Sequence, residues 1–93
     1  MNEVLEFIGR RFPRSNDCNW LDGNCYWFAR ILCMRFPYLE LYYNPIKGHF
    51  YAGDGTNMYD WNGLTIDKEV FSFSWIREND STWYERLVRD CVR

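Results

Sequence analysis

The chain lacks the features that mark several large classes of protein. Lys and Arg number 11 against 13 Asp and Glu, so the net charge is −2, and no basic block indicates a nucleic-acid-binding surface. No hydrophobic run approaches the roughly 20 residues that span a bilayer, and the N-terminal stretch lacks the long apolar region of a signal peptide. The sequence therefore predicts a cytoplasmic protein that binds neither nucleic acid nor membranes.

Histidine and paired cysteine motifs are also scarce. The four cysteines, at positions 18, 25, 33 and 91, contain no Cys-x-x-Cys pair, and a single histidine does not suit a zinc site. We expect no metal or cofactor, and free thiols rather than disulfides. Cys33 and Cys91 fall in helical apolar patterns and are expected in the core. Cys18 is expected to be an ordinary loop cysteine, with a resolving role in redox chemistry as the alternative.

Aromatic residues, by contrast, are abundant. They make up 20% of the 93 residues, and bulky rings let a small domain bury much apolar area per residue. The length fits one domain over residues 1–93, and no repeat, low-complexity tract or linker indicates a second.

Hydrophobic periodicity predicts three helices. An amphipathic helix is expected over Asn2–Phe12, and a helix that is apolar nearly all round is expected over Cys25–Phe36. Such an apolar helix belongs at the centre of a domain, covered on most sides. The last helix is expected to start near Asp80–Thr82, with Thr82 and Glu85 as a capping box.

Runs of strand-forming residues predict a small sheet between these helices. We expect a strand over Tyr38–Asn44, a hairpin over residues 48–61 and a possible further strand over Val70–Ile76, where aromatic residues alternate with polar ones. The predicted fold class is therefore α+β: a buried helix packed on a small antiparallel sheet, with further helices at both ends of the chain.

The single histidine gains a carboxylate partner from the geometry of the hairpin. Asp54–Gly55 suits a two-residue type I′ turn, which would place His49 directly opposite Asp60. A four-residue loop would move the two side chains to a diagonal of the same face, whereas a three-residue loop would separate them onto opposite faces. We expect Asp60 to orient His49, and the central helix to pack on the histidine side of the hairpin.

Cys25 is the candidate nucleophile. It follows Asp22-Gly23-Asn24, where a turn runs into the helix, and the unpaired N–H groups and the dipole at a helix start favour a thiolate. Beside an imidazolium, the pKa of such a cysteine can fall to roughly 3.5–7.5. His49 would then take the proton of Cys25. The alternatives are a buried core cysteine and a purely structural pair of His49 and Asp60.

This order of residues resembles the papain-like superfamily of thiol hydrolases. That group includes papain-type proteases, cell-wall peptidases and amidases, and transglutaminase-like proteins. The resemblance covers roughly Asn19 to Gly63, and the segment Gly23–Trp27 is similar to the family's small-polar-cysteine-aromatic signature. It implies a minimal papain-like fold with a triad of Cys25, His49 and Asp60.

The resemblance also extends to the loop before Cys25. Asn19 stands where papain-type members carry the glutamine of the oxyanion hole, so it implies an oxyanion role for Asn19. The position of this loop suggests that Asn19 and Trp20 line one wall of the site.

These observations lead to two hypotheses of different classes. The first is a small papain-like hydrolase or acyltransferase, in which Cys25 attacks an amide bond of a peptide or related substrate. The second is a non-catalytic binding or inhibitory protein of phage or mobile-element origin, with exposed Trp20, Tyr42 and Tyr43 contacting a protein partner. A degenerate transglutaminase-like fold that binds a peptide without turnover is a third possibility. Solvent access to Cys25 distinguishes them.

Overall fold

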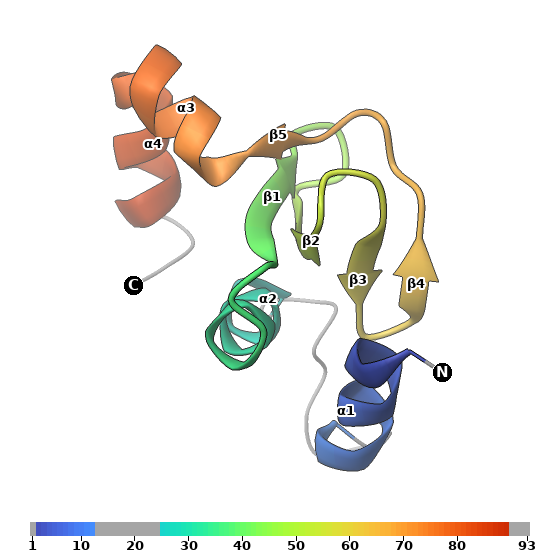
Figure 1. Ribbon diagram of the computed structural model, residues 1–93. Helices are drawn as coiled ribbons and strands as arrows, with labels where there is room; N and C mark the ends of the chain where they lie inside the picture. Colours follow the sequence, from blue (N-terminus) through green and yellow to red (C-terminus); the bar gives the residue numbers. More distant parts are fainter. Residues whose placement is uncertain (1, 13–24, 90–93) are drawn as a thin grey trace.

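A computed structural model describes residues 2–12 and 25–89 of the 93-residue chain. Over these residues it contains four helices and one antiparallel five-stranded sheet with the strand order β4-β3-β2-β1-β5 (Figure 1). The elements are α1 (Glu3–Arg11), α2 (Cys25–Arg35), β1 (Glu40–Asn44), β2 (His49–Gly53), β3 (Met58–Asp60), β4 (Gly63–Thr65), β5 (Phe71–Ser72), α3 (Phe73–Asn79) and α4 (Ser81–Leu87). The predicted α+β fold class is confirmed.

Helix α1 begins where its sequence predicts. Asn2 is the N-cap, and its side-chain oxygen accepts hydrogen bonds from the backbone N–H groups of Val4 and Leu5, at 2.8 and 3.1 Å. The Asn2 amide also donates to the hydroxyl of Tyr59 at 2.8 Å. The same residue therefore starts the helix and fastens it to the sheet, at the β4 end of the molecule (Figure 1).

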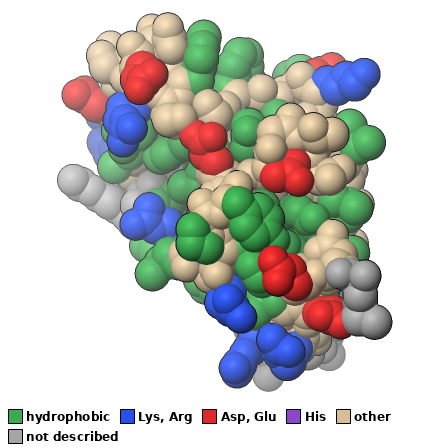
Figure 2. Space-filling view, viewed as in Figure 1, with side chains coloured by type: hydrophobic (Ala, Val, Ile, Leu, Met, Phe, Trp, Pro, Cys, Tyr) green, Lys and Arg blue, Asp and Glu red, His purple; other side chains and the backbone are tan. Residues whose placement is uncertain are grey.

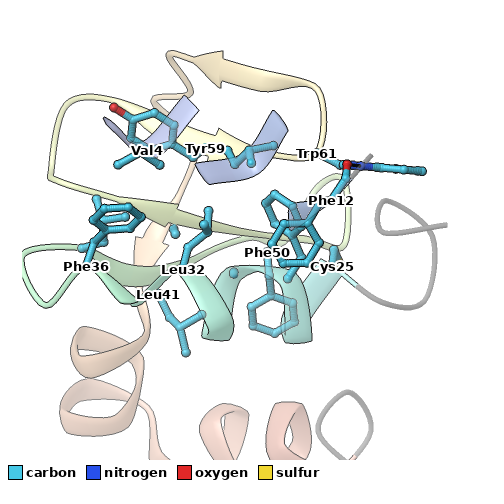
Figure 3. Close-up of a cluster of buried hydrophobic side chains, with 14 of the residues drawn as sticks. Val4, Phe12, Cys25, Leu32, Phe36, Leu41, Phe50, Tyr59 and Trp61 are labelled. Atoms are coloured by element: carbon cyan, nitrogen blue, oxygen red, sulfur yellow. Dashed lines mark hydrogen bonds between the residues drawn. The ribbon is translucent and has the colours of Figure 1, made fainter. Parts of the chain in front are cut away.

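Helix α2 packs on the central strands through one apolar cluster (Figure 3). Its buried side chains are Cys25, Tyr26, Phe28, Ala29 and Leu32. The cluster continues into the hairpin with Phe50, Ala52, Tyr59 and Trp61. The prediction that the helix packs on the histidine side is wrong, because residues alternate between the faces of a strand and the helix covers the apolar face that carries Phe50.

The predicted enclosure of α2 is also incomplete. Trp27 is 46% exposed and Met34 is 72% exposed, although both are large apolar side chains. The helix is therefore buried along one side, against the sheet, and open on the other. An apolar sequence all round the helix overstates its burial, because the small sheet offers only one surface to pack against.

The hairpin between β2 and β3 closes through a longer loop than the sequence predicts. Gly53 pairs with Met58, so residues 54–57 form a four-residue loop. The Asp54 carboxylate accepts hydrogen bonds from two backbone N–H groups of this loop, at 2.8 and 3.0 Å. Gly55 has a positive φ of 102° but Asp54 does not, whereas a type I′ turn needs a positive φ at both central residues. The two-residue turn is therefore wrong, but the even loop length keeps the predicted faces.

The segment after the hairpin contains two elements that the sequence pattern misses. The first is β4, which pairs with β3 so that Asp60 lies opposite Gly63. The second is helix α3. The predicted strand over Val70–Ile76 is correct only at β5, because a helix begins at Phe73. Ser72 caps this helix by accepting a hydrogen bond from the N–H of Trp75 at 3.1 Å. This cap favours a helix where the alternating sequence predicts a strand.

Helix α4 follows α3 almost at once, and the two lie together at the β5 end of the sheet (Figure 1). Asp80 ends α3 and caps α4, because its side chain accepts a hydrogen bond from the N–H of Trp83 at 3.1 Å. The helix therefore lies where the sequence predicts, but its cap is Asp80 rather than the predicted pair of Thr82 and Glu85.

Candidate functional site

Three predicted side chains meet at one end of the sheet. Cys25 is the first residue of α2, His49 is the first residue of β2 and Asp60 is the last residue of β3. His49 Nε2–H donates to Asp60 Oδ2 at 3.0 Å, and the Cys25 thiol is hydrogen-bonded to the His49 side chain. Since Nε2 faces Asp60, Nδ1 is the ring nitrogen left for the sulfur. The four-residue loop accounts for the diagonal contact between His49 and Asp60.

The carboxylate of Asp60 is fixed at both oxygens. While Oδ2 accepts from His49, Oδ1 accepts from the backbone N–H of Asn62 at 2.8 Å, in the turn that leads to β4. The side chains of His49 and Asp60 are only 13% and 12% exposed. A carboxylate that is held in this way fixes both the orientation and the tautomer of the imidazole.

The surroundings of Cys25 favour its thiolate. Burial raises the pKa of the thiol, but hydrogen bonds from the His49 side chain and from the backbone N–H of Phe50, the charge of His49 and the N–H of Tyr26 outweigh it. The net effect is a pKa below the ordinary value for cysteine. The residue is 9% exposed, at the end of the core cluster near Phe12 and Trp61 (Figure 3).

The surroundings of His49 favour its protonated form. The hydrogen bond to Asp60 and then that to Cys25 raise the pKa of His49 to about 9, against the opposing effect of burial. The pKa of Cys25 is lowered while that of His49 is raised, so both shifts favour the charged form of each side chain. The arrangement therefore favours a thiolate–imidazolium pair of Cys25 and His49.

Cys33 provides a comparison within the same helix. It is a free, half-buried cysteine that packs against the core cluster, as its helical pattern predicts. Burial raises its pKa to about 12, with a smaller opposing effect from Arg30 and a smaller raising effect from Glu40. The two thiols of α2 thus differ in chemistry because only Cys25 reaches the histidine.

Other predicted residues fall elsewhere. Asn19 and Trp20, together with Cys18 and Cys91, lie outside the described residues, so the oxyanion and substrate-contact roles stay predictions. The predicted surface residues Tyr42 and Tyr43 are half-buried rather than exposed. The ring of Tyr43 packs between those of Phe50 and Trp83.

Sequence reasoning gave no role to the side chains that surround His49 on its own face of the sheet. The ring of Tyr51 stands nearly perpendicular to the imidazole, with centroids 4.7 Å apart and an interplanar angle of 87°. Its hydroxyl donates to Asp67 Oδ2 at 3.0 Å. The spacing of two residues along a strand does predict that Tyr51 shares the face of His49, whereas Asp67 follows β4, which the sequence pattern did not reveal.

The described residues offer neither a metal site nor a membrane span. Across residues 2–12 and 25–89, His, Cys, Asp and Glu side chains form no group of three or more that could hold a metal ion. No helix in these ranges combines the length and the apolar composition that crossing a membrane requires. On the face shown in Figure 2, acidic and basic side chains are scattered among hydrophobic ones.

Fold and site together define a small α+β protein with a cysteine, a histidine and an aspartate brought together at one end of its sheet. A family model described as Phage YunG-like protein matches residues 4–90, nearly the whole chain. The chain therefore belongs to the Phage YunG-like family. Searches of curated proteins and of solved structures found no match.

This match corrects the resemblance drawn from the sequence. The family that covers the chain is Phage YunG-like and not a papain-like family of thiol hydrolases. A cysteine before a helix, followed by a histidine and an acidic residue on neighbouring strands, is a short pattern that unrelated folds can share. The assignment to the papain-like superfamily is therefore wrong, and any function for Cys25 must be argued from its own surroundings.

Proposed function

We propose that the protein hydrolyses an amide bond or transfers the acyl group of an amide to an acceptor amine. Cys25 would be the nucleophile, His49 the acid and base, and Asp60 the residue that orients His49. The observation that carries this proposal is the chain of hydrogen bonds from the thiol to His49 and from His49 Nε2 to Asp60 Oδ2 at 3.0 Å. A nucleophile, a base and an orienting carboxylate within hydrogen-bond reach are what acyl transfer by a thiol requires.

The proposed reaction uses the ion pair directly. The Cys25 thiolate attacks the carbonyl carbon and forms a carbon–sulfur bond, while the carbonyl π electrons move to the oxygen. As the tetrahedral species collapses, the carbon–nitrogen bond breaks and His49 gives its proton to the leaving amine. Water or an acceptor amine then attacks the thioester, loses a proton to His49 and releases Cys25. Asp60 stabilises the imidazolium at each stage.

The start of α2 supplies a place for the developing oxyanion. The backbone N–H groups in the first turn of a helix have no partner within the helix, and the positive end of the helix dipole lies there. We assign this role to the N–H of Cys25, the first residue of α2. Asn19 remains the side chain proposed to complete the hole.

The test is the pH dependence of iodoacetamide labelling, measured by peptide mass. Trypsin places Cys25 in the peptide 15–30 together with Cys18, so a Cys18→Ser background is needed, while Cys33 lies in a separate peptide and serves as the internal control. We expect Cys25 to react at pH 6 at least about tenfold faster than Cys33, because an ordinary thiol with a pKa of ~8.5 is barely ionised there.

Removal of the imidazole provides the second arm of this test. His49→Ala should slow labelling of Cys25 at pH 6 by about tenfold and leave Cys33 unchanged. A Cys25 that reacts only near the pKa of a free thiol, or that reacts equally well without His49, contradicts the proposal. If the ion pair is present, Cys25→Ala should abolish turnover of amide substrates while the protein still folds.

The family match favours a second candidate, a phage-encoded binding or inhibitory protein that uses the scaffold without catalysis. A hollow of about 360 Å³ at the β5 end would suit a partner side chain. It is lined by Glu40, Tyr42, Val70, Phe71, Ser72 and Trp75. In this candidate Cys25 is a core residue, so absence of low-pH labelling, together with unchanged biological activity of Cys25→Ala, would favour binding over catalysis.

A further inference from the structure

We infer that Tyr51 and Asp67 are positioning residues that hold the His49 imidazole in line with Cys25. The inference rests on the proposed function of Cys25, and it adds residues that act through His49 rather than on a substrate. Neither side chain reaches the sulfur in the described contacts, so their effect passes through the imidazole.

The hydrogen bonds of His49 leave one motion of its ring unrestrained. Contacts at both ring nitrogens, to Asp60 and to Cys25, define an axis about which the imidazole can still tilt. The ring of Tyr51 stands at 87° to the imidazole, with centroids 4.7 Å apart, and blocks this tilt from the side. Both residues belong to β2 and lie two positions apart, so they share a face of the sheet.

Tyr51 is itself fixed at its far end. Its ring is buried, and its hydroxyl donates to Asp67 Oδ2 at 3.0 Å. The same oxygen accepts from the Asn44 amide at 2.8 Å, and Asn44 is only 1% exposed. A phenol tied to a carboxylate that is tied in turn to a buried amide has little freedom to rotate away from the imidazole.

Asp67 is held by further contacts that keep it a carboxylate. Its Oδ1 accepts from the N–H of Glu69 at 3.0 Å, and Lys47 Nζ lies 3.8 Å from Oδ2. Burial raises its pKa, but the hydrogen bonds and the charge of Lys47 outweigh this and hold the pKa below its usual value. The titratable and charged groups around His49 are therefore Cys25 on α2, Asp60 on β3 and Tyr51 on β2, with Asp67 and Lys47 behind Tyr51.

The test compares Tyr51→Phe and Asp67→Asn with a matched control. Tyr51→Phe keeps the ring but removes the hydrogen bond to Asp67, and Asp67→Asn keeps the volume but removes the charge. Tyr59→Phe is the control, because Tyr59 is another buried tyrosine whose hydroxyl has a side-chain partner, Asn2, on the opposite face of the sheet. Unfolding by urea is measured for all variants in parallel.

Two measurements report on the imidazole. The chain has one histidine, so its ring protons give unambiguous NMR signals whose pH titration reads the state of His49. The rate of Cys25 alkylation at pH 6 reports the fraction of Cys25 that is present as thiolate beside His49. We expect Tyr51→Phe and Asp67→Asn to lower the His49 midpoint and to slow alkylation by about tenfold, below the hundredfold that a 1 Å displacement can cost. Tyr59→Phe should change neither.

A purely structural role gives a different result. If Tyr51→Phe and Asp67→Asn lose stability as Tyr59→Phe does, but the His49 midpoint and the alkylation rate stay at the wild-type values, the inference is overturned. Should one of the two variants fail to fold, the other is decisive by itself. If the wild-type thiol reacts only near its ordinary pKa, the proposed function fails, and the His49 titration alone still decides whether Tyr51 and Asp67 position the ring.

Discussion

At the scale of single residues, the two described cysteines of α2 differ through their neighbours. Cys25 and Cys33 lie on one helix, and burial raises the pKa of both. Only Cys25 also receives hydrogen bonds from an imidazole and from the backbone N–H groups of Phe50 on β2 and Tyr26 on α2, so its net shift has the opposite sign. The reactivity of a thiol in this fold therefore depends on what lies opposite it across the helix–sheet interface.

The pKa of His49 gives a prediction at this scale. The wild-type imidazole should titrate near 9, far above the ordinary value of 6.5. In Cys25→Ala the midpoint should fall but stay above 6.5, because the hydrogen bond to Asp60, the largest cause of the shift, remains. Asp60→Asn should lower the midpoint further than Cys25→Ala does. The NMR titration of the single histidine measures all three proteins.

The sign of the effect on stability follows from the same shift. A histidine whose pKa is higher in the folded than in the unfolded protein stabilises the fold fully below about pH 6.5. This contribution is lost as the pH rises through about 9. If His49 had the same midpoint in Asp60→Asn as in the wild type, Asp60 would not be the main cause of the raised pKa of His49.

At the scale of elements, the junction between α3 and α4 depends on Asp80. Asp80→Ala should cost about 1 kcal/mol of unfolding free energy, because its carboxylate caps α4 through the N–H of Trp83. Thr82→Ala should change the unfolding free energy by less than about 0.5 kcal/mol, since Thr82 lies inside the helix as an exposed side chain. Urea unfolding of the two variants measures the difference.

If Thr82→Ala cost more unfolding free energy than Asp80→Ala, the result would support the capping box of Thr82 and Glu85 that the sequence predicts. That box and the observed cap differ by two residues, although both place the start of α4 within the same turn. Patterns of polar residues locate a helix start more reliably than they identify its cap, because neighbouring Asp, Ser and Thr can each serve as the acceptor.

Local patterns were sufficient for the elements that hold the candidate site. The helix from Cys25, the strands on either side of Asp54 and the shared face of His49 and Asp60 all follow from periodicity and from an even loop length. What local patterns could not supply is the choice of face for α2, which depends on the whole apolar set around Phe50. The contact between Tyr51 and Asp67 was equally hidden, since it joins a strand residue to the segment between β4 and β5.

At the scale of the whole molecule, the core has one main cluster, in which side chains of α1 and α2 pack with those of the sheet. Leu32 is 0% exposed within it, so Leu32→Ala should cost roughly 2–5 kcal/mol. Met34 lies on the same helix but is exposed, and Met34→Ala should change stability by less than about 0.5 kcal/mol. Equilibrium unfolding of the matched pair tests whether the α2–sheet interface is the main source of stability.

Similar costs for the two variants would instead mean that the exposed side of α2 is covered in solution by something else. Trp27 shares that open side with Met34. A midpoint of unfolding that depends on protein concentration would then show that self-association covers this side. A midpoint that does not depend on concentration would mean that the α2–sheet interface contributes less to stability than we expect.

The position of Cys25 between a helix and a strand also ties its chemistry to the integrity of the fold. The sulfur belongs to α2 and the imidazole to β2, and only the packing of one on the other keeps them in contact. When α2 separates from the sheet, the thiol loses its partner and returns to the weak acidity of an ordinary cysteine. We therefore expect the thiol of an unfolded chain to react more slowly at neutral pH than the thiol of the folded protein.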